Sequence, residues 1–121
     1  MFLKLNHQKL DIYQASRQFV IECYTLKRQF PVEEKFGMIS QIRRAALSVH
    51  LNIVEGASRK SEAERKRYFE IARGSVIEVD AAFEIANQLN YLKEVDMSNL
   101  ELLTVNCFKM LTGLLNTKID N

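Results

Sequence analysis

Two helical patterns joined by a short turn occupy residues 40–75, SQIRRAALSVHLNIVEGASRKSEAERKRYFEIARGS. Around the first half of this stretch, apolar residues recur at alternating steps of three and four, the spacing of one buried helix face. They are Ile39, Ile42, Ala46, Val49 and Ile53. Gly56 follows this stripe, and glycine often ends helices in the left-handed conformation. We therefore expect one helix that ends at Gly56.

The second half of the stretch opens with a capping box. Ser61 precedes Glu64 by three residues, a spacing that satisfies two free amide groups at a helix start. No proline follows before Tyr91, so we predict the longest helix here, with about 30 residues. Gly74 and Ser75 lie in its middle, where glycine costs about 1 kcal/mol relative to alanine. We interpret this pair as a close helix crossing, with a hinge or a ligand approach as the alternative.

One further apolar stripe lies on each side of this hairpin. The N-terminal stripe is Ile12, Ala15, Phe19, Cys23, Leu26 and Phe30, and Pro31 follows it. The C-terminal stripe is Leu100, Leu103, Cys107, Met110 and Leu114. Four helices with short connections predict an all-α fold, an antiparallel up-and-down four-helix bundle, in a single domain over residues 1–121. The expected core includes Phe19, Ile42, Ala46, Val49, Phe69, Val76, Phe83, Leu103 and Cys107.

The composition favours a helical protein of the cytoplasm. Glycine and proline are scarce, tryptophan is absent, and no stretch approaches the roughly 20 apolar residues of a membrane span. Cys23 and Cys107 lie on the apolar stripes and have no histidine or cysteine at metal-ligand spacing. We expect two buried thiols in a reducing compartment, with a disulfide or a reactive thiol as the alternative. No metal site and no membrane contact are predicted.

No motif indicates catalysis or a cofactor. The histidines are His7 and His50, and the residue three positions before His50 is Leu47 rather than the glutamate of a di-iron bundle site. Phosphate-binding loops, zinc motifs and an activated nucleophile are absent from the sequence. We expect no enzyme activity, no catalytic residue and no cofactor, and we interpret His50 as a flanking or interface side chain.

The charge is unevenly distributed along the chain. Residues 1–73 contain 14 basic and 8 acidic residues, a net charge of +6, whereas residues 74–121 contain 3 and 7, a net charge of −4. A basic ribbon along the central hairpin is a candidate nucleic-acid surface, since it could bind phosphates with release of counterions. Its residues are Arg43, Arg44, Arg59, Lys60, Arg65, Lys66, Arg67 and Arg73. Interleaved glutamates support the alternative of an ordinary solvated face or a protein interface.

Some apolar residues fall outside the core stripes. On a helical wheel, Leu47, Leu51 and Val54 are displaced to one side of the second helix, and Leu102 and Val105 lie outside the stripe of the fourth. Scattered surface leucines are common, but aligned residues at i and i+4 favour a subunit interface. We therefore predict a homo-oligomer.

Three segments carry a resemblance to a known family: SQIRRAALSV (40–49), NIVEGASRKS (52–61) and YFEIARGSVIEV (68–79). They resemble the four-helix-bundle proteins encoded in intervening sequences of bacterial 23S ribosomal RNA genes, and the similarity runs from about Leu10 to Ile119. The resemblance implies a bundle that assembles into a ring, commonly a pentamer, with no known catalytic activity. A related fold in diversity-generating retroelements looks like a basic pentameric nucleic-acid binder.

The functional hypothesis combines the charge pattern with this resemblance. It is a non-catalytic homo-oligomeric protein that binds RNA or DNA or serves as a nucleoprotein adaptor, and the resemblance implies that the oligomer is a cyclic pentamer. The alternative is a scaffold that binds a partner protein and never contacts nucleic acid.

Overall fold

A computed structural model describes residues 2–26 and 30–116 of the 121-residue chain. A short 3-10 helix, η1 (Asn6–Lys9), precedes the helix α1 (Asp11–Thr25), and a second, η3 (Val32–Glu34), precedes α2 (Met38–Ala57). The helices α3 (Glu62–Gln88) and α4 (Ser98–Asn116) complete the described chain. The end of the family-like stretch, up to Ile119, lies outside the described residues.

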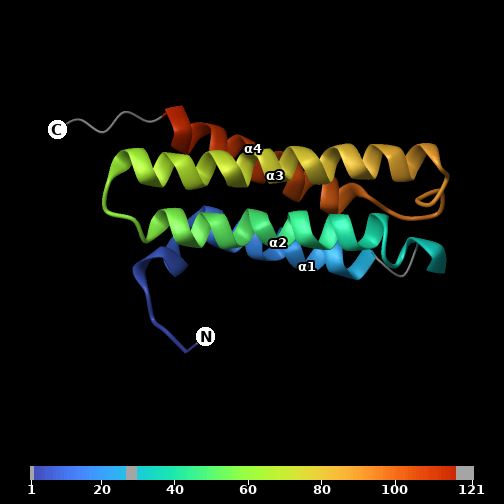
Figure 1. The fold of residues 1–121 in the computed structure, drawn as a ribbon, viewed down its shortest axis with the longest axis horizontal. Helices are drawn as coiled ribbons and strands as arrows, with labels where there is room; N and C mark the ends of the chain where they lie inside the picture. Colours follow the sequence, from blue (N-terminus) through green and yellow to red (C-terminus); the bar gives the residue numbers. More distant parts are fainter. Residues whose placement is uncertain (1, 27–29, 117–121) are drawn as a thin grey trace.

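The four α-helices lie side by side along the long axis of the molecule (Figure 1). Each helix packs against the next along the chain, and α1 also packs against α4, which closes the bundle. The predicted all-α, antiparallel four-helix bundle is confirmed. The turn between α2 and α3, the N-terminal segment and the end of α4 all lie at the same end of the bundle (Figure 1).

The core follows the stripes read from the sequence. Eight of the nine expected core residues are buried, and the ninth, Leu103, is partly buried against them. In α4 the fully buried positions are Cys107 and Leu111, because the core-facing side of this helix is turned slightly from the expected stripe. Both Cys23 and Cys107 are buried free thiols, as expected.

The first helix is shorter than its apolar stripe. α1 ends at Thr25, and residues 27–29 lie outside the described part of the chain. Phe30 is nevertheless buried, and its ring lies 5.7 Å from that of Tyr91 between centroids. The stripe therefore predicted the burial of Phe30 correctly but placed it wrongly on the first helix, because Phe30 enters the core from the connection before η3.

Gly56 does not end α2 in the left-handed conformation. It lies within the helix, which continues to Ala57, and no glycine among the described residues has a positive φ. A Cβ at Gly56 would lie 2.9 Å from Cε1 of Phe69 and 3.0 Å from Cβ of Tyr68. Glycine is therefore required by the close approach of α3, and the prediction of a glycine cap was wrong.

At Gly74 the structure contradicts the expected close helix crossing. It is exposed on α3, and a Cβ placed on it would meet no atom within 4 Å, so it does not mediate a helix crossing. Its neighbour Ser75 does face α2, where its hydroxyl lies 3.0 Å from that of Ser48. The close contact of α2 and α3 therefore depends on Ser75 and Gly56.

An asparagine in the left-handed conformation, Asn90, ends α3 before Tyr91. Asn90 has a φ of 64°, and its amide donates to the carbonyl of Asn87. The amide of Tyr91 donates to the carbonyl of Ala86, which completes the Schellman pattern. Asparagine tolerates this left-handed position better than most residues. The helix therefore stops at Gln88, three residues earlier than predicted.

Candidate nucleic-acid interface

The turn between α2 and α3 carries the densest group of cations in the sequence. Ser58 caps α2, and the Ser61 hydroxyl accepts a hydrogen bond of 3.1 Å from the amide of Glu64. This bond is the serine half of the predicted capping box. Because the connection is so short, the five basic residues between positions 59 and 67 are held at one end of the bundle (Figure 1). They are Arg59, Lys60, Arg65, Lys66 and Arg67, and we refer to them as the turn cluster.

Arg65 stabilises the turn itself. Its Nη1 donates to the carbonyl oxygens of Arg59 at 2.9 Å and of Lys60 at 3.0 Å. These carbonyls lie beyond the end of α2 and have no helical partner. The guanidinium of Arg65 is therefore committed to the backbone.

Arg59 packs on Tyr68. Its Cζ lies 5.1 Å from the centre of the tyrosine ring, and its Nη2 donates to the Tyr68 hydroxyl at 3.2 Å. The same Nη2 lies 3.4 Å from a carboxylate oxygen of Glu55. The Nε of Arg59 is buried without a hydrogen-bond partner among the described residues. Arg59 thus fixes the position of Tyr68 at the edge of the cluster.

The remaining members of the turn cluster differ in whether they form an ion pair. Lys66 forms an ion pair of 3.0 Å with Glu62 one turn earlier in α3. Lys60 and Arg67 are exposed, and neither forms an ion pair within the described residues. Arg67 lies over the ring of Tyr68, with Cζ 6.0 Å from the ring centre. Lys60 and Arg67 are therefore the cations best placed to meet an external anion.

The structure does not join the other three arginines to this cluster. Arg44 pairs with Glu78 across the outer side of α2 and α3. Arg43 lies over the ring of Tyr24 in α1, with Cζ 4.4 Å from its centre. The eight residues therefore do not form the single ribbon that the sequence suggested, because successive positions on a helix point to different neighbours.

Arg73 shows the same separation on the opposite side of the hairpin. Its Cζ lies 4.4 Å from the ring centre of Phe108 in α4. Its Nε donates to the hydroxyl of Thr112 at 2.9 Å. Arg73 therefore belongs to the packing of α3 on α4.

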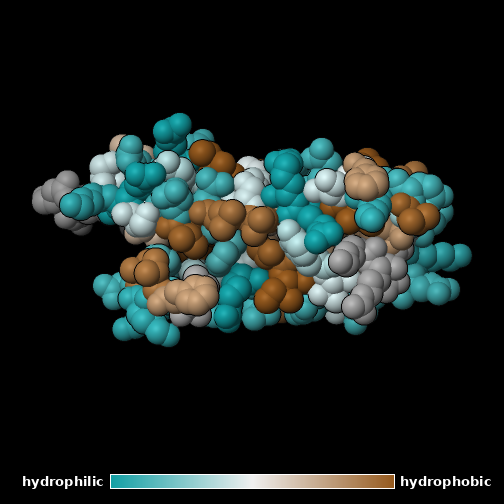
Figure 2. Space-filling view, turned by 60° about the horizontal axis from the view of Figure 1, so that its bottom comes forward, coloured by the Kyte–Doolittle hydropathy of each residue, from teal (hydrophilic) through white to brown (hydrophobic). Residues whose placement is uncertain are grey.

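The candidate interface leucines are on the surface. The exposed fractions are 39% for Leu47, 54% for Leu51, 59% for Leu102 and 41% for Val105, while Val54 is half-buried. Figure 2 turns the α1 side of the bundle toward the viewer and shows apolar side chains gathered across its middle. Leu47, Leu51 and Val54 lie on α2, and Leu102 and Val105 lie on α4, so the two groups belong to different faces.

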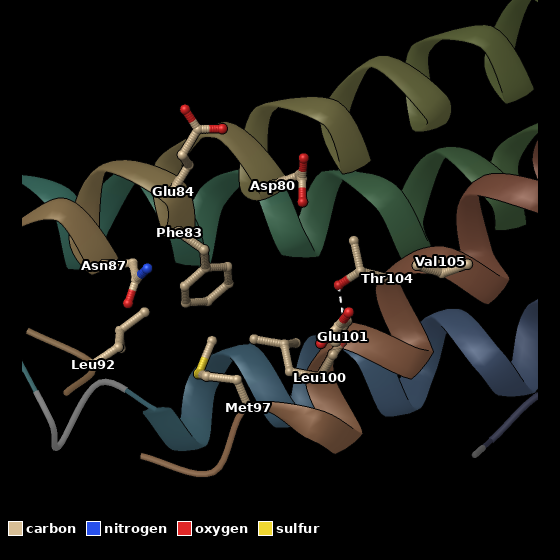
Figure 3. Close-up of a pocket in the computed structure, with 10 residues that line it drawn as sticks. All are labelled: Asp80, Phe83, Glu84, Asn87, Leu92, Met97, Leu100, Glu101, Thr104 and Val105. Carbon is tan, nitrogen blue, oxygen red and sulfur yellow. Dashed lines mark hydrogen bonds between the residues drawn. The ribbon is translucent and has the colours of Figure 1, made fainter. Parts of the chain in front are cut away.

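A groove between α3 and α4 was not found by sequence reasoning. Two adjoining hollows of about 380 and 360 Å³ share Asp80, Thr104 and Val105, and we refer to them together as the α3–α4 groove. Figure 3 shows Phe83, Leu92, Met97 and Leu100 converging between the helices, while Asp80 and Glu84 project from α3 at the rim. The sequence signal was the acidic pair at i and i+4, which resembles any solvated helix face.

Sequence reasoning also missed the surroundings of His50. Its Nδ1 lies 2.7 Å from the hydroxyl of buried Ser16, and its ring lies 4.8 Å from that of Tyr13 between centroids. The Ser16 hydroxyl also lies 3.1 Å from the carbonyl oxygen of Tyr13 and can donate its one proton there, in which case it accepts from Nδ1 of His50. Burial, followed by the charges of Arg17 and His7, lowers the pKa of His50 below its usual value.

None of the helices in the described part of the chain is long and apolar enough to cross a membrane. Among the same residues, no three histidine, cysteine, aspartate or glutamate side chains come together as metal ligands.

Residues 8–113 match the sequence model of one protein family, described as 23S rRNA-intervening sequence protein. The match spans most of the chain, including all four α-helices up to Gly113. This chain belongs to the 23S rRNA-intervening sequence protein family. The resemblance carried by the three segments around the α2–α3 hairpin is thereby confirmed.

A solved structure shows the same fold as this 23S rRNA-intervening sequence protein family member. It is a crystal structure, at 1.70 Å resolution, of a protein of unknown function from the S23 ribosomal protein family of Bacteroides thetaiotaomicron. The TM-score is 0.77 at 20% sequence identity, over 88% of this chain and 99% of the other. At this identity the similarity establishes the fold alone. Among proteins with curated descriptions, none matches this sequence.

Proposed function

We propose that this chain is a non-catalytic, homo-oligomeric protein of the cytoplasm that binds nucleic acid through the turn cluster. The observation that carries this proposal is the pair of exposed cations Lys60 and Arg67, which form no ion pair among the described residues, with Arg67 over the ring of Tyr68. The two cations can bind phosphates, and the tyrosine ring can stack on an unpaired base. RNA is the proposed ligand rather than DNA, because the loops of RNA expose unpaired bases that can stack on an aromatic ring.

The charge of one copy is modest. Residues 55–67 contain five cations and three carboxylates, a net charge of +2. Binding by one such site would be weak, so the proposal includes a homo-oligomer, a cyclic pentamer by resemblance. Several copies of the turn cluster on one assembly would bind together, because each bound site raises the effective concentration of the next.

The test is a salt titration of binding to a structured RNA and to a DNA duplex. The wild type is compared with Lys60→Glu/Arg67→Glu, which changes the two free cations and leaves Arg59 and Arg65 in place. We expect the affinity of the wild type to fall steeply between 50 and 200 mM salt, by about tenfold or more. The variant should lose most of its affinity at low salt.

A matched control separates this site from overall charge. Lys35→Glu/Lys93→Glu makes the same change of charge on exposed residues that lie outside the turn cluster and outside the α3–α4 groove. This control should bind RNA nearly as well as the wild type. Equal binding by the turn variant and the wild type, or no binding at 50 mM salt, would favour the rival function, a scaffold for a partner protein.

A further inference from the structure

The α3–α4 groove combines an apolar floor with an uncompensated acidic rim. Asp80 and Glu84 of α3 and Glu101 of α4 are exposed, and their carboxylates have no ion-pair or hydrogen-bond partner among the described residues. One cation, Lys109, lies at the end of the groove beside Phe108. The groove therefore carries three negative charges and one positive charge around apolar side chains.

The opposite side of the bundle has the complementary character. Arg43, Leu47, His50 and Val54 follow one another at i, i+4, i+7 and i+11 and so lie along one line of α2. The contacts of Arg43 with Tyr24 and of His50 with Ser16 show that this line faces the α1 side. Together with Leu51 and the exposed Arg17 of α1, we refer to these residues as the α1–α2 seam.

The helices follow one another around the bundle in chain order, so the α1–α2 seam and the α3–α4 groove lie on opposite sides. We propose that the α3–α4 groove of one copy receives the α1–α2 seam of a second copy. This inference rests on the proposed homo-oligomer and specifies how its copies meet. The contact is heterologous, because each copy contributes a different surface, and such contacts form closed rings or open filaments.

Charge and hydrophobicity both favour this occupant. The leucines of the seam would be removed from water by packing on the apolar floor of the groove, which residues such as Phe83 and Leu100 form. Arg17 and Arg43 would meet the carboxylates of the rim, which have no partner among the described residues of their own copy. Complementary charge fixes the register and the choice of partner in such an interface. A groove between two helices also suits a third helix, whose side chains fit between theirs.

The experiment exchanges the charges of the two surfaces. The groove variant is Asp80→Lys/Glu84→Lys/Glu101→Lys, and the seam variant is Arg17→Glu/Arg43→Glu. Native mass spectrometry and light scattering at 50 mM salt give the mass of the assembly, and circular dichroism checks the fold. We expect each variant alone to be monomeric, with at least a tenfold weaker self-association than the wild type. An equimolar mixture of the two variants should assemble again, because the reversed charges complement each other.

A matched control is Glu33→Lys/Glu64→Lys/Glu94→Lys, which makes the same change of charge at exposed positions outside the groove. It should assemble like the wild type. If the wild type assembles and the groove variant keeps its mass, the inference is overturned while the homo-oligomer stands. Two monomeric, folded variants that fail to assemble when mixed would also overturn it. A monomeric wild type would instead refute both the homo-oligomer and this inference, and would favour a basic helix of another protein as the occupant of the groove.

Discussion

The ring of Phe69 on α3 occupies the space that a side chain on Gly56 of α2 would need. A Cβ at Gly56 would lie 2.9 Å from Cε1 of that ring and 3.0 Å from its Cδ1. The third close atom is Cβ of Tyr68, which is attached directly to the backbone and cannot rotate away. The two helices therefore approach as closely as they do because residue 56 is glycine.

We expect Gly56→Ala to destabilise the protein, because an overpacked core costs about 1–3 kcal/mol. The gain of about 1 kcal/mol that alanine brings to a helix interior offsets part of this cost, so the net loss should reach up to about 2 kcal/mol. The control is Gly74→Ala, where no atom lies within 4 Å, and which should gain about 0.5–1 kcal/mol. Urea denaturation measures both. Equal effects at the two positions would contradict the close approach at Gly56.

Arg65 and Arg67 are only two residues apart, but they should contribute differently to the free energy of unfolding. Arg65→Ala removes the donor to two carbonyl oxygens of the turn and should cost about 1–2 kcal/mol. Arg67→Ala removes an exposed side chain and should change the free energy of unfolding by less than about 0.5 kcal/mol. Thermal denaturation of the two variants decides between these roles, and a larger loss for Arg67 would refute the assignment.

The environment of His50 predicts how stability depends on pH. Its pKa is lowered in the folded protein, mainly by burial, from an ordinary value of 6.5. The unfolded chain therefore takes up a proton first as the pH falls, and stability declines below about pH 6.5. His50→Gln should flatten this decline between pH 7.5 and pH 5. Urea unfolding at several pH values gives the slopes, and parallel slopes for variant and wild type would disagree with the assignment.

Both cysteines should resist alkylation in the native protein. Burial raises the pKa of Cys23 and of Cys107 to about 12, so almost no thiolate forms at pH 8. We expect slow reaction with iodoacetamide at pH 8 and rapid reaction of both thiols in guanidinium chloride, followed by mass spectrometry. Ser40→Cys supplies an exposed thiol as a positive control. Rapid native labelling of Cys23 or Cys107 would show that the core opens readily.

The sequence predicted the helices well because burial leaves a periodic trace. It placed Phe30 on the stripe of the first helix, but periodicity detects burial rather than helical backbone, and Phe30 is buried from a loop. The sequence could not show which glycine lies at a close helix contact and which is exposed. Gly56 allows close contact between helices and Gly74 faces solvent, a distinction that depends on the residues of the opposing helix.

The candidate site was predictable only in part. The turn cluster followed from a run of cations beside a capping box, both of which are local features. The positions of Arg43 and Arg73 depend on Tyr24 and Phe108, which belong to other helices and are distant in the chain. The α3–α4 groove likewise requires residues of two helices, and its acidic residues are ordinary in each helix taken alone.

The tight α2–α3 hairpin also bears on the order of folding. Its helices are joined by a turn that Ser61 and Arg65 fix locally, so its contacts close over a short stretch of chain. The pairing of α1 with α4 joins the two ends of the described bundle and carries a larger loop-closure entropy. We therefore expect the hairpin to form first and α4 to dock late. During synthesis on the ribosome, the hairpin would already be complete while α4 was still emerging, so the α3–α4 groove would form last.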